Sequence, residues 1–246
     1  MTHPSGLLGV AGPMARTVED VQFLFSVLAG YDPADPFSAP VPPTSYEADG
    51  ARIGLMAQFG DVPVQTACRQ AVEQAAREFE ENGFAVREFK PRGLERAPNV
   101  WSFFFSELTV PFTRELLAGR EELAHWTGTE FYLRLKDRPE PTGRQVVEML
   151  AARDAMRASM LAQMEDVDML LCPGAGVTAF PHRQRKFPTE GREIGLFQAT
   201  MPLVWVNLLG FPALTIPVTE DAGVQLIGRP WEEERLFAVA SEIGLG

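Results

Sequence analysis

The feature that most constrains the fold is a short apolar run, then an amphipathic helical pattern, then a second short apolar run. Residues 52–56 and 85–89 have the length and composition of buried strands. Between them, Pro63 is suited to the first turn of a helix, and Asn82-Gly83 is suited to its end. One face of that helix is apolar, formed by Cys68, Val72, Ala75 and Phe79. The order predicts two parallel neighbouring strands joined by a right-handed crossover.

The same alternation continues along the chain and predicts an α/β fold with one sheet covered by helices. Further strands are expected at 168–172, 213–218 and 224–229, with helices at about 197–209 and from about Trp231. Residues 98–166 are expected to be mainly helical, with Pro111 kinking or ending the first helix. Helix starts are predicted at Thr17, with Asp20 three residues later, and at the Thr142/Gln145 capping box. Gly30 is the expected C-cap of the first helix.

Composition narrows the class of protein. The 246 residues suffice for one large core or two small ones. A net charge of -11 argues against nucleic acid as a partner, because no basic stripe is available to neutralise phosphates. Two cysteines make no disulfide framework, and no apolar run is long enough to span a bilayer. We therefore expect a cytoplasmic protein without a membrane partner.

Four segments carry a family resemblance, in the order in which that family has them. They are GPMARTVED at 12–20, VDMLLCP at 167–173, NLLGFPALTIPV at 207–218 and VQLIGRP at 224–230. Together they resemble the C-terminal portion of amidase signature enzymes, which hydrolyse amides with a Ser–cis-Ser–Lys triad. The resemblance implies a mixed sheet covered by helices, with residues 1–246 as a single, incomplete amidase-like domain. In the family the triad precedes the first segment, so the N-terminal catalytic strands are expected to be absent.

The catalytic chemistry of that family needs a serine on a glycine-rich turn, a relaying serine, and a lysine that burial keeps neutral. No Gly-Gly-Ser or Ser-Gly-Gly segment occurs, and Lys90, Lys136 and Lys186 are expected at the surface. We therefore predict no catalytic residues and no activity for this chain alone. It would supply the scaffold and substrate pocket of an amidase that converts carboxamides to carboxylate plus ammonia or amine.

Substrate-pocket candidates follow from the resemblance, since the C-terminal half of these enzymes forms much of the wall around the substrate. The candidates are Trp101, Phe105, Phe197, Met201 and Trp205, which suit a small, apolar amide; the alternative is that they fill the core. Histidines and cysteines lie in no metal-ligand spacing, and Gly174-Ala175-Gly176 lacks the context of a dinucleotide site. No metal or cofactor is expected.

Two other functions remain open. Cys172, at the end of an apolar strand with His182 ten residues on, is a possible nucleophile, although a free cysteine is usually a small buried side chain. The other is a non-catalytic binding module that pairs through an exposed sheet edge. Its partner would be the missing N-terminal amidase half or a second copy of the chain. The residues do not favour an amidotransferase component over a free amidase.

Overall fold

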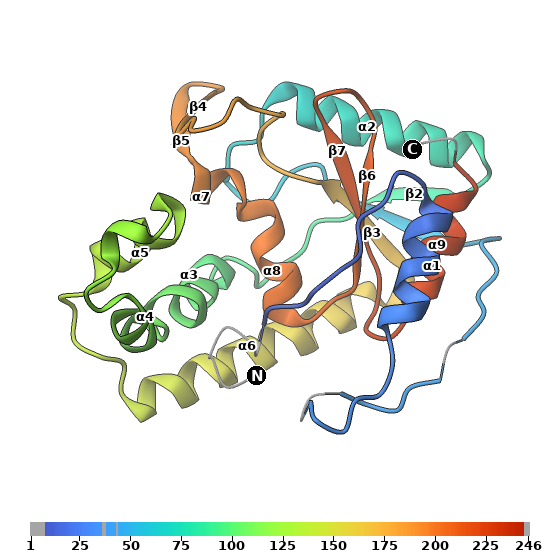
Figure 1. Ribbon diagram of the computed structural model, residues 1–246. Helices are drawn as coiled ribbons and strands as arrows, with labels where there is room; N and C mark the ends of the chain where they lie inside the picture. Colours follow the sequence, from blue (N-terminus) through green and yellow to red (C-terminus); the bar gives the residue numbers. More distant parts are fainter. Residues whose placement is uncertain (1–7, 36–37, 43, 244–246) are drawn as a thin grey trace.

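The computed structural model describes residues 8–35, 38–42 and 44–243, which form a sheet between two layers of helices (Figure 1). The five-stranded sheet has the order β2-β1-β3-β7-β6. The strands are β1 (Arg52–Leu55), β2 (Ala85–Glu88), β3 (Met169–Pro173), β6 (Ala213–Pro217) and β7 (Gly223–Ile227). The first three are parallel, whereas β7 is antiparallel to both β3 and β6. The expected mixed sheet and the parallel pairing of the first two strands are both confirmed.

Alternating side chains of the strands divide the core into two layers. Met169 and Leu171 of β3 face one side, where α2 (Thr66–Glu81) and α9 (Glu233–Ser241) pack. Leu170 and Cys172 face the other side, covered by α3 (Ala97–Ser102), α6 (Gly143–Gln163) and α8 (Met201–Leu209). Every residue of β3 is buried, as expected for a central strand covered on both faces.

The first helix, α1 (Val18–Leu28), packs on α9 rather than on the sheet. The Phe25 and Phe237 rings lie 5.5 Å apart, and Gln22 Nε2 donates a hydrogen bond to Glu234 Oε2 at 2.8 Å. Thr17 caps the helix as predicted, because its hydroxyl accepts from the Asp20 backbone N–H at 3.1 Å. The predicted C-cap is one residue late, since the Ala29 N–H already closes the last turn on Phe25.

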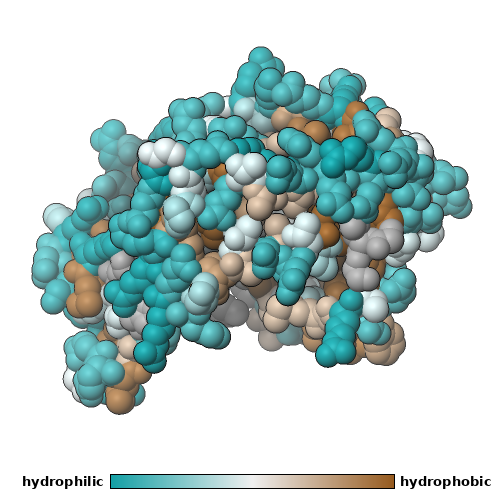
Figure 2. Space-filling view, turned by 90° about the horizontal axis from the view of Figure 1, so that it is seen from above, coloured by the Kyte–Doolittle hydropathy of each residue, from teal (hydrophilic) through white to brown (hydrophobic). Residues whose placement is uncertain are grey.

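A helical lobe projects from the sheet and is made of α3, a π-helical turn η2 (Phe103–Glu107), α4 (Val110–Leu117), η3 (Glu121–Leu123) and α5 (Trp126–Leu135). Figure 1 shows α6 running from this lobe back under the sheet. From above, the surface is mainly hydrophilic, and less polar residues gather in the recess between lobe and sheet (Figure 2). The helical run that begins with α3 ends at Glu107, and Pro111 lies in the first turn of the next helix, α4, where its missing N–H removes no helical bond, so the expected break at Pro111 is confirmed.

The long helix α6 begins at the predicted capping box. Thr142 Oγ1 accepts from the Gln145 N–H at 3.3 Å, and Gln145 Oε1 accepts from the Thr142 N–H at 2.8 Å. Met156 and Met160 are buried on the apolar stripe, and Met164 opens the 3-10 turn η4 (Met164–Asp166) that leads to β3. These methionines share one core cluster with Leu170 and Cys172 of β3, so they hold α6 against the sheet.

A hairpin that the sequence did not predict stands above the sheet. It consists of β4 (Lys186–Thr189) and β5 (Arg192–Gly195), and α7 (Leu196–Ala199) follows it. Gln65 holds it, donating from Nε2 to the Pro188 carbonyl at 2.8 Å and accepting at Oε1 from the Thr178 N–H at 2.9 Å. This role keeps residue 65 extended, so α2 begins at Thr66 and not at Pro63 as predicted.

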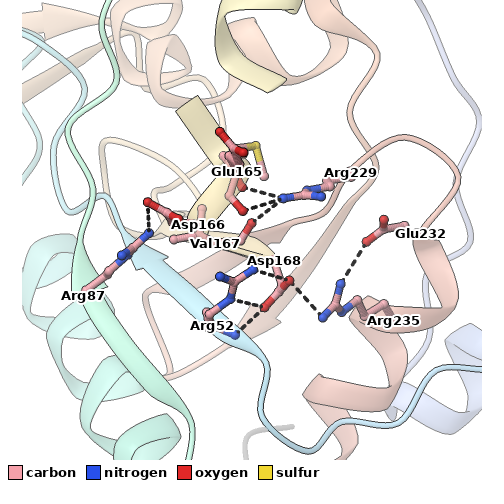
Figure 3. Close-up of polar contacts among 10 residues, drawn as sticks. Arg52, Arg87, Glu165, Asp166, Val167, Asp168, Arg229, Glu232 and Arg235 are labelled. Atoms are coloured by element: carbon pink, nitrogen blue, oxygen red, sulfur yellow. Dashed lines mark hydrogen bonds and ion pairs between the residues drawn. The ribbon is translucent and has the colours of Figure 1, made fainter. Parts of the chain in front are cut away.

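A polar network ties the amino ends of β1 and β3 to α9 (Figure 3). Asp168 accepts from the Arg52 backbone N–H at 2.8 Å and from Arg52 Nε at 3.0 Å. Arg235 Nη2 lies 3.1 Å from the other carboxylate oxygen. Arg229 donates to the carbonyls of Met164 and Val167 at 2.6 and 3.0 Å, which satisfies the end of the 3-10 turn.

No helix in the part of the chain that the structure describes is both long and apolar enough to cross a membrane.

Candidate aromatic substrate wall

Three of the five predicted pocket residues come together at the base of the helical lobe. The Trp101 and Phe105 rings are stacked, with centroids 4.4 Å apart and planes 19° apart. The Phe197 ring lies 5.4 Å from Trp101 at 38°. All three are half-buried, so each side chain is partly packed and partly accessible. We refer to Trp101, Phe105 and Phe197 as the aromatic cluster.

Local helix geometry brings the first two rings together. Trp101 and Phe105 are four residues apart, the spacing that places side chains on one helix face. The intervening π-helical turn is closed by the Leu108 N–H on the Phe103 carbonyl at 2.9 Å. Thr109 Oγ1 also donates to the Ser106 carbonyl at 2.9 Å. π-Helical turns are frequent at functional sites.

Asn207 anchors the cluster from a distant part of the chain. Its Oδ1 accepts from Trp101 Nε1 at 3.1 Å, which joins α3 to α8. Phe197 belongs to a different element, the short helix α7 that follows the β4–β5 hairpin. Asn207 begins the NLLGFPALTIPV segment, yet it was not among the predicted pocket residues. The only signal in the sequence for Asn207 is its place at the start of this segment, because a hydrogen bond between residues 106 positions apart leaves no local sequence pattern.

The other two candidates are core residues in this arrangement. Met201 is 5% exposed and Trp205 is fully buried, both on α8. Trp205 packs against Phe211 with ring centroids 5.8 Å apart. Its indole Nε1 is buried and has no hydrogen-bond partner among the described residues. Trp205 belongs to the core layer against which Trp101 and Phe105 pack, and neither Trp205 nor Met201 joins the aromatic cluster.

The hypothesis of a Cys172 nucleophile is contradicted. The Cys172 side chain is fully buried within β3, and burial raises the pKa of its thiol to about 12. His182, the suggested base, is exposed on the loop before β4. A thiol needs exposure and a lowered pKa to act as a nucleophile, and Cys172 has neither. It is a small apolar core residue.

The described lysines behave as surface groups. Lys90 pairs with Glu88 at 2.8 Å and Lys186 with Glu193 at 3.3 Å, and Lys136 is exposed. Among the residues described, no three His, Cys, Asp or Glu side chains gather as metal ligands would.

A groove of about 340 Å³ lies between α2 and β2, apart from the aromatic cluster. Charged side chains form most of its lining, with Leu55, Ala76 and Val86 beneath: Glu73, Arg77, Glu80, Arg87 and Glu88. This composition does not suit an apolar amide, so the groove is not the predicted pocket.

Comparison with known proteins places this chain in a family. The family model described as "Amidase" matches residues 4–237, and the chain therefore belongs to the amidase family. It is 31% identical to a glutamyl-tRNA(Gln) amidotransferase subunit of Thermus thermophilus and 26% identical to the corresponding protein of Thermosynechococcus vestitus. Each match covers 93% of this chain and 53% of the relative.

The fold agrees with solved amidase structures. A bacterial aryl acylamidase of the amidase signature family superimposes with a TM-score of 0.77 at 23% identity, covering 94% of this chain and 51% of that one. The expected fold class is therefore confirmed. The chain spans about half the length of the curated relatives it matches.

Proposed function

We propose that this chain is the scaffold and substrate-pocket portion of an amidase that converts carboxamides to carboxylate plus ammonia or amine. The observation that carries this is the aromatic cluster, held by Asn207 of a family segment, in a chain that belongs to the amidase family. Residues 1–246 would be one incomplete domain; residues 1–7 and 244–246 lie outside the described residues. Both cysteines are free and buried, which supports a reducing, cytoplasmic setting.

In this proposal the chain positions the substrate, and the half of the enzyme that carries the nucleophile completes the site. Stacked rings have few rotatable bonds, so Trp101 and Phe105 form a stiff apolar wall against which an acyl or amine group lies. Holding the amide in place lets a nucleophile attack from one direction, and correct orientation is a large part of catalysis. The serine nucleophile and its lysine base would come from the other half.

Turnover of amides by the purified chain tests the catalytic part of the proposal. We expect no hydrolysis of an aryl or an aliphatic carboxamide above the buffer rate, since Lys90 and Lys186 are ion-paired at the surface. Cys172→Ala is the matched control, because this substitution abolishes an activity that depends on the Cys172 thiol and leaves the activity of a contaminant unchanged. Turnover that survives Cys172→Ala and copurifies with the chain would refute the proposal.

The pocket part is tested in a reconstituted enzyme, made by co-expression with the N-terminal half of an amidase. Phe105→Ala should change the preference between aryl and alkyl amides more than it changes labelling by a serine-reactive fluorophosphonate. Phe112→Ala is the control, because Phe112 is 44% exposed on α4, outside the aromatic cluster. A labelled complex with unchanged preference in the Phe105 variant would remove the cluster from the pocket.

A further inference from the structure

The β4–β5 hairpin and the helix α7 form one small unit that stands apart from the main sheet. The hairpin is a two-stranded sheet of its own, and Figure 1 shows it leading into α7. Phe187 of β4 and Ile194 of β5 are buried in a separate cluster with Ala199 of α7. We refer to residues 186–199 as the hairpin unit. Because this cluster joins the strands to α7, the position of the hairpin determines the position of Phe197 on α7.

Gln65, the residue before α2, joins the hairpin unit to the turn that follows β3. Its backbone N–H donates to the Gly176 carbonyl of that turn at 2.9 Å. Its side chain donates to the Pro188 carbonyl in β4 at 2.8 Å and accepts from the Thr178 N–H at 2.9 Å. Gly176 in turn donates to the Ala199 carbonyl at 2.7 Å, and a Cβ on Gly176 would lie 3.0 Å from that oxygen. Gln65 therefore contacts both the hairpin unit and the turn against which α7 packs.

Glu190, at the tip of the hairpin, makes the second attachment. Its carboxylate accepts hydrogen bonds from the Thr66 hydroxyl and the Arg69 guanidinium, both near the start of α2. The helix α2 has no acidic residue in its first turn and no side-chain cap, so Glu190 supplies the negative charge that a helix start favours. The hydrogen bonds from Thr66 and Arg69 lower the pKa of Glu190. The hairpin unit is thus held at its tip as well as along β4.

Phe197 differs from the other two rings of the aromatic cluster in what holds it. Trp101 and Phe105 stack within the helical lobe, and Asn207 fixes Trp101. Phe197 instead reaches the cluster from the hairpin unit, with its ring 5.4 Å from Trp101. The attachments of that unit to α2 are polar, and the Glu190 side chain is 63% exposed. Such hydrogen bonds are individually weak, so the loss of one allows the unit to shift while the main sheet stays folded.

We propose that Gln65 and Glu190 are positioning residues of the aromatic cluster: they latch the hairpin unit onto the start of α2, and this latch holds Phe197 against Trp101. The width of the apolar wall, and with it the preference between aryl and alkyl amides, then depends on two side chains that touch no substrate. An aryl group contacts both rings while the latch is closed and loses one of them when the unit shifts. The effect on substrates rests on the proposed function, whereas the latch is a property of this chain.

A small set of variants separates positioning from general support of the fold. Gln65→Ala removes both side-chain bonds of that residue, and Glu190→Ala removes the attachment at the tip. Glu190→Gln retains an oxygen that accepts from the two α2 donors and should therefore keep the latch closed. Gln74→Ala is the matched control, because Gln74 lies on α2 and its side chain donates to Glu78 at 3.1 Å, away from the hairpin unit. Glu190→Ala decides the test if Gln65→Ala does not fold, since an exposed side chain is no part of the core.

The first measurement uses the chain alone, labelled with fluorotryptophan, and follows each indole ring by fluorine NMR. Trp101→Phe identifies the Trp101 resonance, and Phe197→Leu gives its position when the third ring is absent. Gln65→Ala and Glu190→Ala should each move the resonance at least halfway to that position, while Trp205, buried in α8, stays in place. The control and Glu190→Gln should match the unmodified chain. An unmoved Trp101 resonance in the folded alanine variants would overturn the proposal.

The second measurement compares benzamide with butyramide as substrates of the reconstituted enzyme. Loss of the latch removes a contact that substrate and transition state share, so KM for benzamide should rise about fivefold while kcat stays within about twofold. KM for butyramide should change by less than about twofold, because an alkyl group gains little from a second aromatic ring. A KM for benzamide that is unchanged, or that rises equally for both amides, would overturn the role in specificity.

The two measurements also separate the latch from the proposed function. A moved Trp101 resonance, in a chain whose reconstituted form hydrolyses no amide, supports the latch and counts against the amidase assignment. Hydrolysis of amides with an unmoved resonance and an unchanged KM supports the assignment and refutes the latch.

Discussion

Replacing Asp168 by asparagine should destabilise the fold by about 2 kcal/mol, a value worked from its pKa. Burial alone would raise the pKa of this carboxyl. Hydrogen bonds from the side chain and backbone of Arg52, with the charges of Arg235 and Arg52, outweigh burial and lower the pKa from 3.8 to about 2. At about 1.4 kcal/mol for each pKa unit, the ionised form gains about 2.5 kcal/mol. The Arg52 side chain is 45% exposed, so solvent screening reduces this gain.

The sign of the pH dependence follows from the lowered pKa. The Asp168 carboxylate takes up a proton in the unfolded state before it does so in the folded state as pH falls. The contribution of Asp168 to the free energy of unfolding is therefore complete above about pH 4. It is lost progressively as pH falls from about 4 to about 2, the folded-state value. Urea unfolding at a series of pH values should therefore show the unmodified chain and Asp168→Asn converging in this range.

Asp166→Asn is the matched control, because Asp166 is two residues away and is also paired with an arginine. Its side chain is 76% exposed, and its nearest contact to Arg87 is 3.6 Å. Exposed pairs of this kind contribute at most about 1 kcal/mol. The reasoning is wrong if the two variants lose equal stability at pH 7, or if the loss in Asp168→Asn does not depend on pH.

Three further predictions concern packing and reactivity. Gly54→Ala should lower the free energy of unfolding, measured by heat or urea, by about 1–3 kcal/mol, because the new Cβ would lie 2.7 Å from a methyl group of the buried Leu170. Gly143→Ala is the control and should be neutral or stabilising, because a Cβ there would meet open space. Cys172 should resist a disulfide reagent at pH 8 until denaturant is added, since burial raises its pKa to about 12; rapid labelling of the native chain would contradict this. Trp101→Phe should lose about 1 kcal/mol with the hydrogen bond to Asn207, and a double-mutant cycle with Asn207→Ala should show coupling.

Elements with a local signal were predictable from sequence. The Thr142/Gln145 capping box marks the start of α6, and this signal lies within four consecutive residues. The apolar run at 52–56 indicated β1 because a central strand needs apolar residues on both faces. The five strands were also assigned to one sheet, and they form one.

Elements that depend on distant partners were not predictable. The β4–β5 hairpin was not predicted from the sequence, and Gln65 supports it from 123 residues away. In the candidate site, the sequence offered five apolar residues without ranking them. Trp101 meets Phe105 through local helix geometry, whereas its contacts to Phe197 and Asn207 require the tertiary fold. The burial of Trp205 on α8 depends on packing around the whole helix.

The position of β1 beside β3 governs how this chain is able to fold during synthesis. Their pairing and the Arg52–Asp168 contacts join residues 116 positions apart. At about 5–20 residues per second, the ribosome delivers β3 roughly 6–23 s after β1. The β6–β7 hairpin, by contrast, closes between neighbours such as Thr215 and Gln225, and hairpins form in about 1–10 μs. The apolar β1 strand therefore emerges well before the β3 strand beside which it is buried, and it stays without that neighbour while translation continues.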